Sequence, residues 1–94
     1  MPEPSDESRV NKLRYRAWRR GFIEADLILG PFTDTHAPRF DAAELDELER
    51  LLDELDHDLY GWIIGQLPTP AAFDGPVMAL LKASLPTVHA ARRV

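Results

Sequence analysis

The 94-residue sequence contains no cysteine, which excludes disulfide bonds, thiolate zinc sites, iron–sulfur ligation and a cysteine nucleophile. It also lacks an apolar run of the roughly 18 to 20 residues that a membrane-spanning helix needs. Its five glycines form neither a dinucleotide-binding fingerprint nor a phosphate-binding loop. At this length we expect one domain, residues 1–94, without a deep cavity for a large cofactor.

Other catalytic patterns are missing as well. The three histidines, His36, His57 and His89, have no histidine three or four residues away, and no serine lies in a glycine-flanked elbow. We therefore expect no catalytic residue, no metal site and no enzyme. The first eight residues carry three acids, unlike a secretory signal or an organellar presequence. This start predicts a protein of the bacterial cytoplasm.

The charges that are present are unevenly distributed along a chain of net charge −5. Six of the eleven basic residues lie between Arg9 and Arg20, and nine of the sixteen acids lie between Asp41 and Asp58. One interpretation is that a basic and an acidic helix pair inside one bundle. The other is that the basic segment contacts a partner, although the net negative charge disfavours nucleic acid and anionic membranes.

Hydrophobic periodicity predicts an all-α protein, a compact antiparallel bundle of five helices with no sheet. The first helix is expected over 6–19, and the second begins after Gly21 and is stopped by Gly30 and Pro31. Residues 1–8 and 87–94 are expected to fray.

The later helices have recognisable start signals. Asp41 and Glu44 form a capping-box pattern before a third helix that should end near Leu55. Asp56 can cap a fourth helix that Gly65 closes. Asp74 followed by a proline predicts the start of a fifth, which Pro86 should end.

The corner between the first two helices is the best candidate for a binding surface. Arg19 and Arg20 lie beside aromatic residues, Gly21 permits a sharp turn, and Glu24 falls in the first turn of the next helix. Arginine and aromatic residues are enriched at interface hot spots. In the alternative reading Glu24 only caps its helix, Arg20 only pairs with Glu24 or Asp26, and nearby Trp18 belongs to the core.

These residues resemble a known family. The RGxxE pattern at 20–24, the following DLILGPF stretch and the DLYGW segment at 58–62 are similar to the SdhE/YgfY flavinylation factors, called succinate dehydrogenase assembly factor 2 in mitochondria. The resemblance extends from about residue 13 to 85. The loop TDTHAPR at 33–39 departs from the family pattern, which leaves the partner range open.

The resemblance implies a five-helix assembly chaperone that is not an enzyme. Its partner would be the flavoprotein subunit of succinate dehydrogenase, and in many bacteria the related fumarate reductase, whose covalent flavinylation with FAD it promotes. The chain would bind no cofactor stably, since the FAD belongs to the partner, and we expect a monomer that contacts neither nucleic acid nor membrane.

The resemblance also implies which residues meet the partner. Arg20, Gly21 and Glu24 match the functional motif of the family. Five more match neighbouring family positions: Arg19, Asp26, Asp58, Tyr60 and Trp62. We expect the corner to present the Arg20 guanidinium and the Glu24 carboxylate outward. The alternative function is a small helical regulatory or nucleic-acid-binding module that uses the basic first helix.

Overall fold

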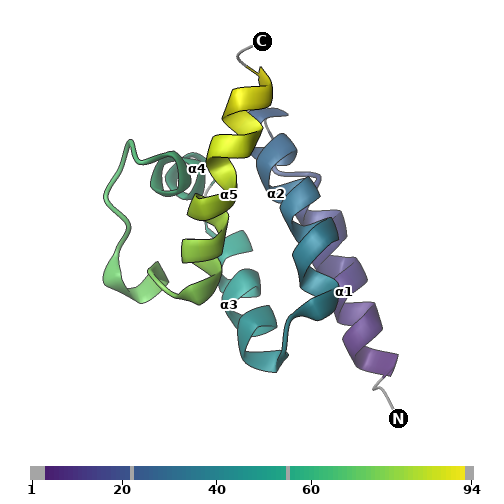
Figure 1. Ribbon diagram of the computed structural model, residues 1–94. Coiled ribbons are helices and arrows are strands. Elements are labelled where there is room, and N and C mark those ends of the chain that lie inside the picture. The colour runs from purple at the N-terminus through teal and green to yellow at the C-terminus, as the bar shows by residue number, and fades with distance from the viewer. Residues whose placement is uncertain (1–3, 22, 55, 93–94) are drawn as a thin grey trace.

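A computed structural model describes residues 4–21, 23–54 and 56–92 (Figure 1). These residues form five α-helices and two 3₁₀ turns, in the order α1 (Pro4–Ala17), α2 (Ile23–His36), η1 (Ala37–Arg39), α3 (Ala42–Leu52), α4 (Asp56–Ile64), η2 (Ala71–Phe73) and α5 (Pro76–Arg92). The described residues contain no strand, so the all-α prediction is confirmed. In Figure 1, α2 runs back along α1, while α3, α4 and α5 form the other half of the bundle.

The basic and acidic segments pair with each other on the surface of the bundle. Arg9 on α1 binds Asp46 and Glu49 on α3, the latter at 2.9 Å, and Arg16 binds Asp53 at 2.5 Å. The hydrogen bond to Asp46 raises the pKa of the Arg9 guanidinium. The pairing interpretation of the charge pattern is therefore confirmed. Such exposed pairs contribute about 0 to 1 kcal/mol each.

The second helix is longer than the sequence predicts. It continues through Gly30 and Pro31 to His36, so the expected stop is wrong. A proline inside a helix removes one backbone donor, but its φ is compatible with the helix. Phe32, which follows it, is buried in the core, and this burial offsets the lost hydrogen bond.

The third helix begins as predicted. Asp41 accepts a hydrogen bond from the Glu44 backbone N–H, and the Glu44 side chain accepts one from the Asp41 backbone, which completes the capping box. The helix ends at Leu52, three residues earlier than expected; residue 55 lies outside the described ranges. The Leu52 carbonyl accepts instead from Arg20.

The fifth helix begins at Pro76 as predicted, but another residue caps it. The Glu47 carboxylate on α3 accepts hydrogen bonds from the backbone N–H groups of Val77 (2.9 Å) and Met78 (3.2 Å). No such bond is recorded for Asp74. The helix also continues past Pro86, contrary to the expected end there. Fraying of 1–8 and 87–94 stays a prediction, and residues 1–3, 93 and 94 lie outside the described ranges.

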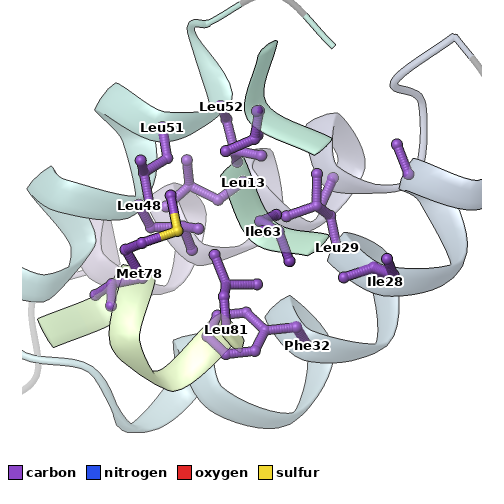
Figure 2. Packing of buried hydrophobic residues seen from close by; sticks show 14 of the residues in the cluster. Leu13, Ile28, Leu29, Phe32, Leu48, Leu51, Leu52, Ile63, Met78 and Leu81 are labelled. Carbon is purple, nitrogen blue, oxygen red and sulfur yellow. The ribbon is translucent and has the colours of Figure 1, made fainter. Parts of the chain in front are cut away.

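The core is one cluster to which all five helices contribute, and Figure 2 shows its packing. Leu13 of α1, Leu29 of α2, Leu48 of α3, Ile63 of α4 and Leu81 of α5 are all buried in it. The α1–α2 corner is therefore held in place by both of its helices.

Candidate functional site

The Arg20 side chain lies in the junction between the two halves of the bundle and is only 8% exposed. Its guanidinium donates to the backbone carbonyls of Leu52 and Glu54, the latter at 2.7 Å. It also forms an ion pair with Asp56 at 2.9 Å. The planar guanidinium of Arg20 thus joins the end of α3 and the start of α4 to the α1–α2 corner.

The expectation that Arg20 points outward is therefore wrong. The last carbonyls of a helix carry partial negative charge and lack partners within the helix, so they attract a guanidinium. The carboxylate of Asp56 adds a full negative charge at the same point. Arg20 accordingly acts as a positioning residue for the corner.

Gly21 makes the turn between α1 and α2 with a φ of +108°. L side chains rarely adopt this conformation. A Cβ at Gly21 would also lie 2.7 Å from Oδ2 of Asp56. The glycine is needed both for the turn and for the close approach of Asp56. Any larger side chain at Gly21 would therefore strain the turn and displace Asp56.

Two acidic residues occupy the first turn of α2. Asp26 accepts a hydrogen bond of 2.7 Å from the Arg20 backbone N–H, which fixes the entry of the chain into the helix. Glu24 lies in the same turn and is half-buried. Arg19 is exposed, with its guanidinium 4.5 Å from the centre of the Tyr15 ring. Arg19 and Glu24 are therefore two charged groups of the corner that a partner can reach.

The expected residues of α4 divide between surface and core. Asp58 and Tyr60 are half-buried, and Tyr60 packs against the core cluster. Trp62 is only 7% exposed and stacks on Phe73 with ring centres 5.0 Å apart. The structure thus places Trp62 among the residues that hold α4 in position.

Sequence reasoning missed Asp56 as a member of this site. It assigned the residue only to the cap of the fourth helix, whereas the structure brings it onto Arg20 and Gly21. These residues lie far apart in the chain, so no local spacing could reveal the contact. The only signal in the sequence was the excess of acids between Asp41 and Asp58.

The starts of α2, α3, α4 and α5 are electrostatically unsuited to phosphate. Carboxylates occupy the first turn or the N-cap of α2, α3 and α4, and Glu47 takes the first backbone N–H groups of α5. A pyrophosphate at any of these positions would meet like charge. Among residues 7–21, 23–54 and 56–84, no cluster of three or more histidines and acids is arranged to hold a metal ion.

Comparison with known proteins identifies the family. The model of a family described as "Flavinator of succinate dehydrogenase" matches residues 11–85. The chain is 33% identical over 95 residues to succinate dehydrogenase assembly factor 2-A, mitochondrial, of Drosophila mojavensis, covering 99% of the chain and 60% of that protein. It is 35% identical over 83 residues to factor 2-B of Drosophila melanogaster, covering 86% and 53%. A Mycosarcoma maydis factor is 40% identical over 65 residues, covering 69% and 27%.

These relatives correct the expected location. All three carry mitochondrial names, which overturns the expectation of a bacterial cytoplasmic protein. That expectation depended on acids in the first eight residues, and the chain spans only 53–60% of the two Drosophila relatives. Within the described part of the chain, no helix has the length and apolar character to cross a bilayer.

The family match covers the α1–α2 corner, the Arg20 junction and all of α4. The resemblance inferred from the RGxxE and DLYGW patterns is confirmed by that match and by the named relatives. The chain belongs to the succinate dehydrogenase assembly factor 2 family, the flavinators of succinate dehydrogenase.

Proposed function

We propose that the chain is a non-enzymatic assembly chaperone. It binds the flavoprotein subunit of succinate dehydrogenase and promotes covalent attachment of FAD to that subunit. The observation that carries the proposal is the match of residues 11–85 to the flavinator family. In this proposal the related fumarate reductase flavoprotein is a second client of the chain.

The α1–α2 corner is suited to select one conformation of a partner. Arg20 ties it to two other helices, Asp26 fixes the backbone of the turn, and Gly21 sets its direction. A rigid surface shifts a partner between two arrangements only by its differential affinity for them. Because the corner is already fixed, little conformational entropy is lost in it when the partner binds.

We place the FAD in the partner. Carboxylates at the starts of α2 to α4, and Glu47 at α5, disfavour a pyrophosphate on this chain. In this proposal Glu24, Arg19 and Asp58 contact the flavoprotein, while Arg20, Gly21 and Trp62 keep those groups in place. The FAD supplies the covalent chemistry within the partner.

The test uses cells that lack their own assembly factor and measures in-gel flavin fluorescence of the dehydrogenase flavoprotein. Glu24→Ala should reduce the fluorescence to the level of cells without the factor, because it removes a corner carboxylate and no recorded hydrogen bond. Asp74→Ala is the matched control, since it removes an exposed carboxylate next to η2. Full fluorescence with Glu24→Ala would contradict the proposal.

A further inference from the structure

Two large aromatic side chains are exposed at the end of α1. Tyr15 is 62% exposed, and Trp18, just beyond the helix, is 40% exposed. They line an open groove of about 330 Å³ together with Asn11, Arg14, Arg19 and Asp34. Two such rings that border one open groove are a candidate contact surface.

The Trp18 ring is fixed in position although it is exposed. It lies on the backbone of α2 at Gly30, where a Cβ would be 2.3 Å from the ring atom Cδ2. Its Nε1 donates to Oδ2 of Asp34 at 3.0 Å, and Arg14 binds the other oxygen of this carboxylate at 2.8 Å. A ring held this way loses little entropy when another surface covers it.

The charge available beside these rings is positive. Arg9, Arg14, Arg16 and Arg20 are each paired with a carboxylate of the chain. Arg19 has no recorded ion pair with the described residues and instead lies over the Tyr15 ring. A guanidinium held against an aromatic face remains open to a carboxylate on its other side.

The apolar surface continues onto α2. Ile23 is 67% exposed and Leu27 is 39% exposed. Ile23, Leu27 and Gly30 are spaced by four and three residues, so they share the face of α2 on which the Trp18 ring lies. The exposed side chains at the end of α1 and those of Ile23 and Leu27 on α2 thus form one continuous surface, and Arg19 lies beside it.

We propose that Tyr15, Trp18 and Arg19, together with Ile23 and Leu27, form a docking surface for a segment of the flavoprotein that carries a carboxylate next to apolar side chains. This inference rests on the proposed function and extends its contact region from Arg19 of the corner onto the exposed apolar side chains of α1 and α2. The carboxylate pairs with Arg19, and the apolar side chains pack on the rings. Tyrosine, tryptophan and arginine are the residues that most often dominate binding at protein interfaces.

Isothermal titration of the full chain with the purified flavoprotein subunit of succinate dehydrogenase tests this surface. Arg19→Glu and Tyr15→Ala should each weaken binding at least tenfold, and the effect of Arg19→Glu should shrink at high salt. Arg50→Glu on α3 is the matched control, because it reverses the charge of another exposed arginine, and it should bind within twofold of the original chain. Circular dichroism should be unchanged in all three variants.

The outcomes separate the two proposals. If the unaltered chain does not bind the flavoprotein, the proposed function is wrong. If the unaltered chain binds and Tyr15→Ala binds equally well, the docking surface is wrong and the proposed function stands, because Tyr15 belongs to the docking surface alone whereas Arg19 also belongs to the corner. Loss of binding in Arg50→Glu as large as in Arg19→Glu would also overturn the surface, because the effect would then reflect net charge alone.

Discussion

At the scale of single residues, Gly21 is constrained twice. Gly21→Ala adds a side chain at a φ of +108° and places its Cβ 2.7 Å from Asp56 Oδ2. We expect a loss of about 2 to 4 kcal/mol in the free energy of unfolding, combining backbone strain with displacement of Asp56 from Arg20. Urea denaturation measures it.

Gly65 supplies the matched control for this substitution. It also has a positive φ, +84°, but nothing lies within 4 Å of a Cβ built there. Gly65→Ala should therefore cost only the backbone term, about 1 kcal/mol. Equal losses at the two glycines would show that the contact with Asp56 contributes nothing.

Glu47 is the second residue with a testable structural role. It is buried and accepts from two backbone N–H groups at the start of α5. Glu47→Ala should destabilise the fold by about 2 to 4 kcal/mol, since it leaves both donors without a partner. Thermal denaturation of this variant beside Glu44→Ala provides the comparison.

The comparison separates a cap within one helix from a cap supplied by another. Glu44→Ala removes one half of the α3 capping box at an exposed site and should cost about 1 kcal/mol. If Glu44→Ala lowers the stability as much as Glu47→Ala, the hydrogen bonds between Glu47 of α3 and the start of α5 contribute no more than the capping box of α3.

At the scale of elements, the sequence predicted helix starts better than helix ends. Asp41 and Glu44 lie three residues apart, so their capping box could be recognised from local spacing. The stop expected at Gly30 was wrong because that glycine serves the packing of Trp18, a contact between two helices. The same limit applies to Arg20, whose partners are the carbonyls and carboxylate of distant residues.

Neighbouring residues of α2 should respond in opposite directions to alanine. Pro31→Ala restores a backbone donor at an exposed site inside the helix, and it should raise the free energy of unfolding by about 1 to 3 kcal/mol. Gly30→Ala should lower it, although helix propensity alone favours alanine, because the new Cβ would lie 2.3 Å from the Trp18 ring. Denaturation midpoints of the two variants decide this, and stabilisation by both would contradict the packing of Trp18.

At the scale of the whole molecule, the basic segment is neutralised by the fold. Arg9 is paired with acids of α3, Arg16 with Asp53 just after α3, Arg14 with Asp34 and Arg20 with Asp56, in a chain of net charge −5. Of the six cations in this segment, Lys12 and Arg19 are left without an ion pair among the described residues, and two cations displace few counterions from a phosphate backbone. The basic α1 is therefore a structural partner of the acidic α3, and no observation favours the nucleic-acid-binding alternative.

Mobility shift with duplex DNA at low and moderate salt tests this conclusion, and we expect no complex. The matched variant Asp46→Asn, Glu49→Gln, Asp53→Asn removes the acids that pair with Arg9 and Arg16 and raises the net charge by three. It should gain weak binding that falls steeply with salt, because two guanidinium groups become available to phosphates. Tight DNA binding by the unaltered chain would show that Arg9 and Arg16 remain available to phosphates despite their ion pairs. Absence of binding in the triple variant would show that the ion pairs are not what keeps Arg9 and Arg16 from binding DNA.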